Sequence, residues 1–246
     1  MKYIRIIPSL MLSNKKLVKG VKFKDHMIAG SPISTVKAFE GQKADEIIIL
    51  DIESYIKQNN GTDLSTLREI SKEINTPLTY GGGIDNLDTA KKIIELGAEK
   101  IYLNRSILNN KINLKNFVDQ FGGQALVVGL NIININGTMK IYEKQDQNLF
   151  EYIDKLQTIG VGEFKITFVD REGTKSGIDI ENCKKLKNKI NVSSIFEGGI
   201  GSLEHISELV ENKIESIALG TLLIFSDYNI FKIKTHLKNQ NFHVRI

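Results

Sequence analysis

The stretch Phe196–Ser202 (FEGGIGS) decides the fold, together with the similar run Tyr80–Asp85 (YGGGID). Each glycine cluster follows a short apolar run and precedes a segment with helical periodicity. A strand, a glycine turn and a helix N-terminus in this order let backbone N–H groups approach an anion closely. Glycine pairs also serve ordinary tight turns, so either copy alone leaves that alternative open.

Similar landmarks recur at one separation along the chain. Three pairs of residues are 117 positions apart: Gly82 and Gly199, Glu46 and Glu163, and Asn104 and Thr221. This repetition indicates two similar halves, each made of four strand–helix units. Eight such units in about 240 residues have the size of a (β/α)8 TIM barrel. We therefore predict an α/β fold, a single TIM-barrel domain over residues 1–246 with a two-fold half-barrel repeat.

Apolar runs alternate with segments of helical period along the whole chain. The strands are predicted near 3–9, 45–51, 76–80, 100–104, 124–131, 163–169, 192–196 and 215–219. The helices are predicted near 33–41, 63–75, 86–96, 112–119, 148–159, 179–189, 202–212 and 228–238. Helix-start signals stand at Ser31-Pro32, Asp63, Asp85 and Ser202. Longer loops at 15–30 and 134–147 follow the first and fifth strands, on the face where a barrel carries its function, and 137–142 could form a small hairpin.

Composition excludes several classes of protein. Hydrophobic residues make up 41% of the chain and charged residues 25%, and no apolar run reaches membrane-spanning length. The start of the chain lacks the apolar core of a signal peptide, and the single Cys183 excludes an internal disulfide, so we expect a cytoplasmic protein. The lysines at 15–24 could attract a phosphorylated or acidic substrate, but without interleaved aromatic residues they do not indicate nucleic-acid binding. No metal-ligand spacing is visible, and we expect no cofactor.

In a barrel the residues at the carboxyl ends of the strands face the site. These positions are Ser9, Met11, Asp51, Tyr80, Asn104, Asn131, Asp170, Glu197 and Thr221. Asp51 and Asp170 each end an apolar run and could act as a general base, bind a hydroxyl or only cap a turn. The run Gly173–Gly177 is a polar loop able to bind an anion, although its spacing is not that of a P-loop. The four scattered histidines are interpreted as structural.

A second set of charges stands at the opposite ends of the strands. Its members are Arg5, Glu46, Lys100 and Glu163, which open the first, second, fourth and sixth strands. Inward side chains of a barrel lie in layers, so two acids and two bases could form a ring of ion pairs across its bottom. From the residues alone, a plug that only adds stability is the favoured interpretation.

Six segments resemble one known family along nearly the whole chain. They are Arg5–Pro8, Leu17–Phe23, Ala44–Glu46 with Leu50–Ile52, Gly81–Ile84, Asp170–Gly177 and Gly198–His205. The sequence is similar to the cyclase subunit of imidazole glycerol phosphate synthase, a duplicated TIM barrel. That family binds a substrate with two phosphates across the top and receives ammonia through the barrel from a glutaminase on the bottom.

The resemblance implies roles for individual residues. Phosphate binding falls on Gly82 and Asn104 at one end of the substrate, and on Gly173, Thr174, Gly199, Gly220 and Thr221 at the other. Lys19 resembles the loop lysine that reaches the substrate. Arg5, Glu46, Lys100 and Glu163 coincide with a charged ammonia gate, which reverses the interpretation as a plug, and Glu99 would face the glutaminase.

The departures from the family concern its chemistry. The two catalytic aspartates are replaced by Met11 and Asn131, neither of which can move a proton near neutral pH. Acid–base groups contribute about 10²–10⁴-fold each, so little ring-closing activity is expected. Glu53, Glu197 and Tyr80 also differ from the family, and a carboxylate such as Glu197 beside a phosphate glycine is unfavourable unless it is protonated or paired.

A preserved gate without the catalytic pair resembles the divergent paralogues found with surface-sugar amidation systems. We therefore expect the barrel to pass ammonia from a glutaminase to an ATP-dependent sugar amidotransferase, which forms an acetamidino group on an acidic sugar. One alternative is a true cyclase of histidine biosynthesis that uses other acids, such as Asp51, Asp170 or Glu197. A second alternative is an inactive barrel that only anchors or activates the glutaminase.

Overall fold

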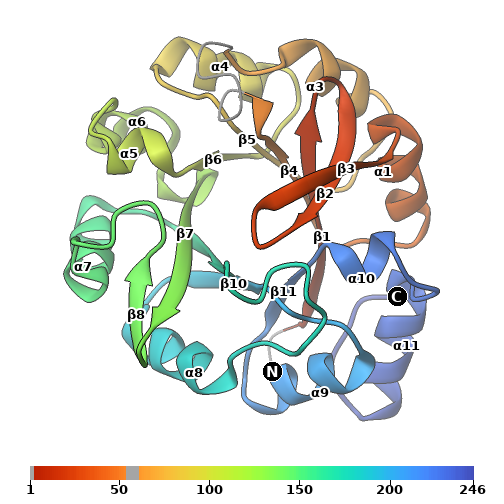
Figure 1. Ribbon diagram of the computed structural model, residues 1–246. Helices are drawn as coiled ribbons and strands as arrows, with labels where there is room; N and C mark the ends of the chain where they lie inside the picture. The colour runs from red at the N-terminus through yellow and green to blue at the C-terminus, as the bar shows by residue number, and fades with distance from the viewer. Residues whose placement is uncertain (1–2, 54–60) are drawn as a thin grey trace.

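The computed structural model describes residues 3–53 and 61–246. Eight parallel strands form one sheet that closes on itself, because the last strand pairs with the first through Arg5–Ser216 to Pro8–Leu219. In Figure 1 these strands surround the centre of the molecule and the helices form an outer ring. The barrel strands are β1 (Arg5–Ser13), β4 (Ile47–Asp51), β5 (Leu78–Gly81), β6 (Lys100–Leu103), β7 (Leu126–Ile135), β9 (Glu163–Phe168), β10 (Ser193–Glu197) and β11 (Ser216–Leu219). The predicted (β/α)8 barrel is confirmed.

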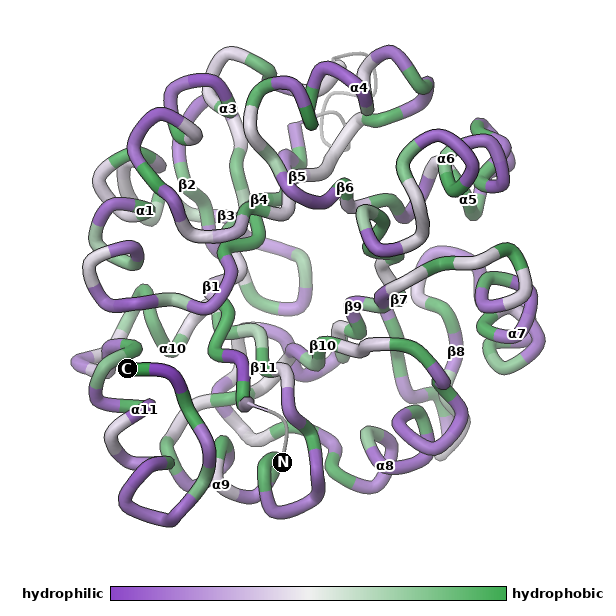
Figure 2. Tube along the Cα trace, turned by 180° about the vertical axis from the view of Figure 1, so that it is seen from behind, coloured by the Kyte–Doolittle hydropathy of each residue, from purple (hydrophilic) through white to green (hydrophobic). Residues whose placement is uncertain are grey.

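The helices include all eight that were predicted, together with two short helices at 105–108 and 221–224 that were not. They are α1 (Pro32–Gly41), α3 (Leu64–Ser71), α4 (Leu87–Glu95), α5 (Arg105–Leu108), α6 (Leu114–Phe121), α7 (Leu149–Ile159), α8 (Ile180–Lys189), α9 (Leu203–Glu211), α10 (Thr221–Ile224) and α11 (Ile230–Asn239), with a short 3₁₀ turn η1 (Gly123–Ala125). Figure 2 shows hydrophilic and hydrophobic residues alternating along this outer ring. No helix among residues 3–53 and 61–246 has the length and apolar character needed to cross a bilayer.

Local contacts explain where helices begin and end. The Asp63 carboxylate accepts from the backbone of Ser65 and Thr66, and Ser202 accepts from His205, so both predicted caps are confirmed. Asn86 caps α4 in place of the predicted Asp85. Helix α3 ends at Ser71, four residues before the predicted end.

Both longer loops are β-hairpins on the carboxyl ends of the strands. Strands β2 (Lys16–Val21) and β3 (Lys24–Gly30) pair antiparallel after β1, and β8 (Thr138–Ile141) folds back onto β7. The second hairpin confirms the prediction for 137–142. The first was predicted only as a loop, because its lysines interrupt any apolar run. These pairings also extend β1 to Ser13 and β7 to Ile135 beyond their predicted ends.

The later elements of the two halves repeat at a separation of 116 residues, one fewer than the predicted 117. Helices α4 and α9, at 87–95 and 203–211, are 116 residues apart, as are α5 and α10 at 105–108 and 221–224. The separation of 117 therefore holds for Glu46 and Glu163 but not for the later elements. The conformational counterpart of Gly199 is Gly83, with φ of 88° and 66°, so the pairing of Gly82 with Gly199 is off by one position.

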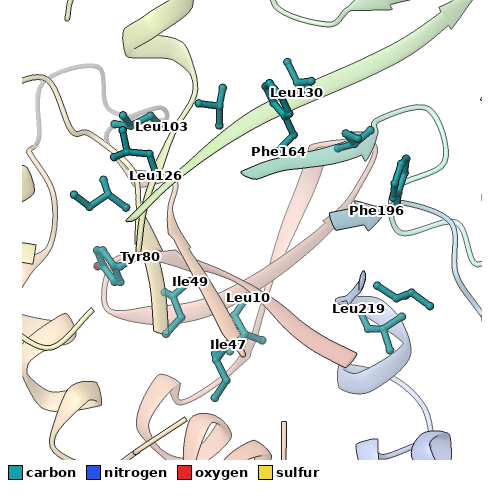
Figure 3. Packing of buried hydrophobic residues seen from close by; sticks show 14 of the residues in the cluster. Leu10, Ile47, Ile49, Tyr80, Leu103, Leu126, Leu130, Phe164, Phe196 and Leu219 are labelled. Atoms are coloured by element: carbon teal, nitrogen blue, oxygen red, sulfur yellow. The ribbon is translucent and has the colours of Figure 1, made fainter. Parts of the chain in front are cut away.

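Strand residues alternate between the barrel interior and the layer under the helices. Figure 3 shows outward side chains such as Ile49, Tyr80 and Phe164 packed in the main hydrophobic cluster. A separate small cluster, Ile7, Ile48, Ile195 and Ala218, fills the interior. Tyr80 was expected to face the site, but it is fully buried in the outer layer and donates to the Asp63 carbonyl at 2.9 Å.

Candidate functional site

A closed ring of charges crosses the amino ends of the strands. Arg5 Nη1 lies 3.0 Å from Glu46 Oε2, and Arg5 Nη2 also pairs with Glu163. Lys100 Nζ lies 2.9 Å from Glu46 and 2.7 Å from Glu163. Each carboxylate therefore bridges two cations. The structure brings together the four residues that the sequence placed in this ring.

Burial and charge give this ring its electrostatic character. Both carboxylates are buried, whereas Arg5 and Lys100 keep 26% and 19% of their side-chain surface exposed. Burial disfavours the charge on Glu163, but Arg5 and Lys100 outweigh it and lower the pKa of Glu163. Burial likewise opposes the charge on Lys100, but Glu46 and Glu163 raise the pKa of Lys100. Both shifts favour the charged forms of Glu163 and Lys100.

The ring is accessible from the bottom face of the barrel. A hollow of about 550 Å³ is lined by Arg5, Ser193 and Ser216 of the barrel end and by residues nearer the chain termini such as Tyr3 and Arg245. Glu99, next to Lys100 at the start of β6, is exposed. Arg5 is the ring residue that borders this hollow, so a small molecule entering here would meet the ring at Arg5.

A second group of four charges, Lys19, Lys165, Glu172 and Glu197, is buried near the carboxyl ends of the strands. We call this group the upper quartet. Lys165 pairs with Glu197, and Lys19 pairs with Glu172; all four side chains are at most 6% exposed. Burial opposes ionisation of Glu197, but Lys165 and Lys19 outweigh it and lower the pKa of Glu197. Burial and the nearby Glu197 raise the pKa of Glu172 in spite of Lys19, so Glu197 is the more readily ionised of the two acids.

The predicted phosphate cradle lies directly beside the upper quartet. Gly173, Gly199, Gly220 and Thr221 line one cleft, together with Glu172 and Glu197. The open volume in it is about 10 Å³, which is the space of roughly one water molecule. A Cβ on Gly220 would lie 2.6 Å from Lys19 Nζ, so Lys19 occupies the space over that glycine. Thr174 lies apart from this lining, and its hydroxyl bonds to Ser176 and to the Arg171 carbonyl.

The predicted acid–base candidates differ in their surroundings. Asp51 is buried, and its two oxygens accept from the backbone N–H groups of Glu53 and Asp63 at 2.9 and 2.8 Å. It follows Leu50, whose side chain packs with the interior cluster, so strand alternation directs Asp51 away from the barrel interior. This geometry favours the capping interpretation over a general base. Asp170 lies in the turn after β9, and its Oδ1 is buried without a hydrogen bond from the described residues.

The second family aspartate position carries an amide that binds a carboxylate from a loop. Asn131 Nδ2 donates to Glu143 Oε1 at 2.6 Å, and Asn104 Nδ2 donates to the same oxygen at 3.2 Å. Glu143 follows β8 and so bridges the carboxyl ends of β6 and β7. Glu143 was not predicted from the sequence, because no local pattern marks it. Met11, the other position, lies on β1 opposite Val18 and Leu50 and supplies no titratable group.

Lys165 was also missed, although the sequence carried a signal for it. Glu163, Lys165 and Thr167 alternate along β9, which places all three on the inward face. Lys165 Nζ lies 3.0 Å from Thr167 Oγ1 and 5.9 Å from the centre of the Tyr102 ring. A lysine at an inward position of a barrel strand predicts an acidic partner inside the barrel.

Comparison with known proteins assigns the family. Residues 5–229 match the family model described as histidine biosynthesis protein. The chain is 35% identical to the imidazole glycerol phosphate synthase subunit HisF of Hydrogenobaculum sp. (strain Y04AAS1), over 98% of both chains. This chain belongs to the HisF family of imidazole glycerol phosphate synthase subunits.

Two further HisF-family relatives have similar identity. The HisF subunit of Exiguobacterium sibiricum is 32% identical over 98% of both chains. A Vibrio vulnificus (strain YJ016) protein, provisionally named as imidazole glycerol phosphate synthase subunit hisF3, is 34% identical over 90% of this chain and 88% of its own length. The resemblance inferred from the sequence motifs is therefore confirmed at the level of the HisF family.

Proposed function

We propose that this HisF-family barrel conducts ammonia from a glutaminase docked on its bottom face to an acceptor at its top face. The intact ring of Arg5, Glu46, Lys100 and Glu163 carries the proposal, because it closes the barrel at the place where the hollow of the bottom face reaches the strands. At the top, Met11 and Asn131 stand where the family's acid–base chemistry would need carboxylates. Delivery of ammonia needs the first feature and not the second.

The acceptor we propose is an amidotransferase that uses ATP to form an acetamidino group on an acidic sugar. The cleft of Gly173, Gly199 and Gly220 has little open volume and two carboxylates in its lining. Lys19, the expected partner of a substrate phosphate, is paired with Glu172 instead. These features argue against the doubly phosphorylated substrate of the family and favour transfer of ammonia to a separate active site.

Replacing Lys100 by Met tests the conduit. The variant leaves Glu46 and Glu163 with Arg5 as the remaining cation of the ring, so the closed arrangement is lost. With a HisH-like glutaminase partner, the amidotransferase and glutamine labelled with ¹⁵N in the amide, we expect most of the label to leave as free ammonia rather than enter the sugar. Lys91→Met on the exposed face of α4 is the control and should transfer label normally.

The same variant distinguishes a barrel that conducts ammonia from one that only anchors the glutaminase. If Lys100→Met still binds the glutaminase and transfers label as efficiently as the unaltered protein, the barrel only anchors its partner. If the unaltered protein never places label in the sugar, the proposed acceptor is wrong.

A second candidate function, ring closure in histidine biosynthesis, is favoured by one observation. Glu143 brings a carboxylate to Asn131, the position of a missing acid–base group. If it replaces that group, the protein should turn over the formimino-ribulose substrate with ammonium salts. Glu143→Gln should then lower kcat by about 10²–10⁴-fold, whereas Glu151→Gln on the outer surface of α7 should not. Absence of turnover in the unaltered protein excludes this function.

A further inference from the structure

Two neighbouring side chains at the mouth of the barrel, Glu143 and Asn104, each carry a buried oxygen that lacks a donor. Glu143 Oε1 accepts from Asn131 and Asn104, but Glu143 Oε2 and Asn104 Oδ1 accept no hydrogen bond from residues 3–53 or 61–246. Leaving a buried acceptor unpaired costs about 1–3 kcal/mol. Two such acceptors on side chains that already touch each other mark a place for a ligand that donates hydrogen bonds.

The charge at this place is negative and uncompensated. Within the described part of the chain Glu143 forms no ion pair, in contrast to the glutamates of the bottom ring and the upper quartet. Burial, with the Glu143 carboxylate close by, raises the pKa of Tyr102 and of Tyr152, so both phenols remain neutral. Glu143 is half-buried, but its Oε2 is enclosed, and a carboxylate there without a counter-charge favours a cation and repels an anion.

We propose that Glu143 and Asn104 form a binding site for a compact nitrogen cation with several N–H donors, of the ammonium or amidinium class. The carboxylate supplies the counter-charge, and Asn104 Oδ1 supplies a second acceptor for another N–H of the same ligand. Charge-assisted N–H···O bonds to a carboxylate are about twice as strong as neutral ones. The family assigns the Asn104 end of the barrel to a phosphate, so this proposal reverses the ligand charge there.

The position of the site connects it to the bottom ring. Lys100, Tyr102 and Asn104 alternate along β6 and its end, so all three face the interior of the barrel. Ammonia that passes the ring beside Lys100 would emerge near Asn104 and Glu143. This inference rests on the proposed ammonia delivery, since an amidinium is the group that transfer of ammonia to an acetamido group creates.

Binding of two small probes to the purified chain tests the site. Acetamidine and acetamide have similar shape, but protonated acetamidine is a cation with N–H donors on both nitrogens, whereas neutral acetamide has a carbonyl acceptor in place of one of them. Followed by NMR titration, acetamidine should bind about tenfold more tightly than acetamide, which is the difference between charged and neutral hydrogen bonds. Glu143→Gln should remove this preference, and Glu151→Gln should retain it. Asn104→Ala should weaken the binding of acetamidine roughly two- to tenfold.

The remaining outcomes separate the sources of the cation and the two proposals. If ammonium chloride displaces acetamidine at a similar concentration, the site binds the incoming ammonium. If it does not, the site is specific for the amidinium. Equal binding of acetamide, an unchanged preference in Glu143→Gln, or tighter binding of inorganic phosphate at Asn104 overturns the inference. Because the titration uses no glutaminase, the site can stand even if label transfer fails, and the reverse also holds.

Discussion

Replacing Lys165 by Met is expected to lower the free energy of unfolding by about 3–5 kcal/mol, the cost of removing one partner of a buried ion pair. Lys165 is 2% exposed and is the direct partner of Glu197. Without it, the Glu197 carboxylate keeps the hydroxyl groups of Thr167, at 3.2 Å, and Ser9, and the more distant Lys19 as its cation. For a chain of this size the loss corresponds to a fall in Tm of roughly 6–20 °C.

A double replacement separates loss of charge balance from loss of packing. Lys165→Met combined with Glu197→Met restores neutrality with side chains of similar volume, so we expect it to be more stable than either single variant. Urea unfolding of the four proteins gives the coupling energy. Lys115→Met, in an exposed pair with Asp119, is the control and should change stability by less than about 1 kcal/mol. If the single variants lower the free energy of unfolding by no more than this control does, the ion pairs of the upper quartet do not stabilise the fold.

The strands and helices could be predicted because their signals are local. Continuous apolar runs recur wherever a strand is covered on both faces, and capping residues mark the helix starts. The β2–β3 hairpin lacked such a signal. Its strands carry Lys16, Lys19 and Lys24 and expose Met27 and Ile28, so neither an apolar run nor clean alternation distinguishes them from a loop.

The predictions for the site depended on which face of a strand each residue occupies. Arg5, Lys100 and Glu163 were placed together because charges at strand starts have few alternatives in a barrel. Asp51 and Tyr80 were assigned to the mouth by strand-end position alone, and alternation places both outside the interior. An error of one residue in the strand alternation places a side chain on the wrong face. Thr79, the residue before Tyr80, points into the barrel and donates to Glu46.

Contacts between distant segments could not be read from the sequence. Glu197 was predicted to be unfavourable beside a phosphate glycine unless paired, and its partner Lys165 lies 32 residues earlier in the chain. The hydrogen bond between Asn131 and Glu143 forms because β8 pairs with β7 and so brings Glu143, which follows β8, back to β7. In both cases the residue types were visible, but only the fold brings them into contact.

Replacing Gly82 by Ala is the second change with a large expected effect, about 2–6 kcal/mol of lost stability, the sum of a backbone cost and a steric cost. Gly82 has a φ of +116°, and a Cβ there would lie 1.9 Å from the backbone oxygen of Asp51. The strained backbone accounts for about 1–3 kcal/mol. The overlap adds about 1–3 kcal/mol, because the contacted atom belongs to a barrel strand and cannot rotate away. The requirement for glycine therefore exists without any bound phosphate.

Two other glycines serve as controls that separate the cost of the strained backbone from the cost of the steric overlap. Gly137, in the β7–β8 turn, has a φ of +80°, but a Cβ there would meet no atom within 4 Å, so Gly137→Ala should show the strain alone. Gly41, at the end of α1, has the same open space without a positive φ, and Gly41→Ala should be neutral or stabilising. Urea midpoints should therefore fall in the order Gly41→Ala, Gly137→Ala, Gly82→Ala. If Gly82→Ala is no worse than Gly137→Ala but abolishes binding of a phosphorylated ligand, Gly82 serves the ligand and not the packing against Asp51.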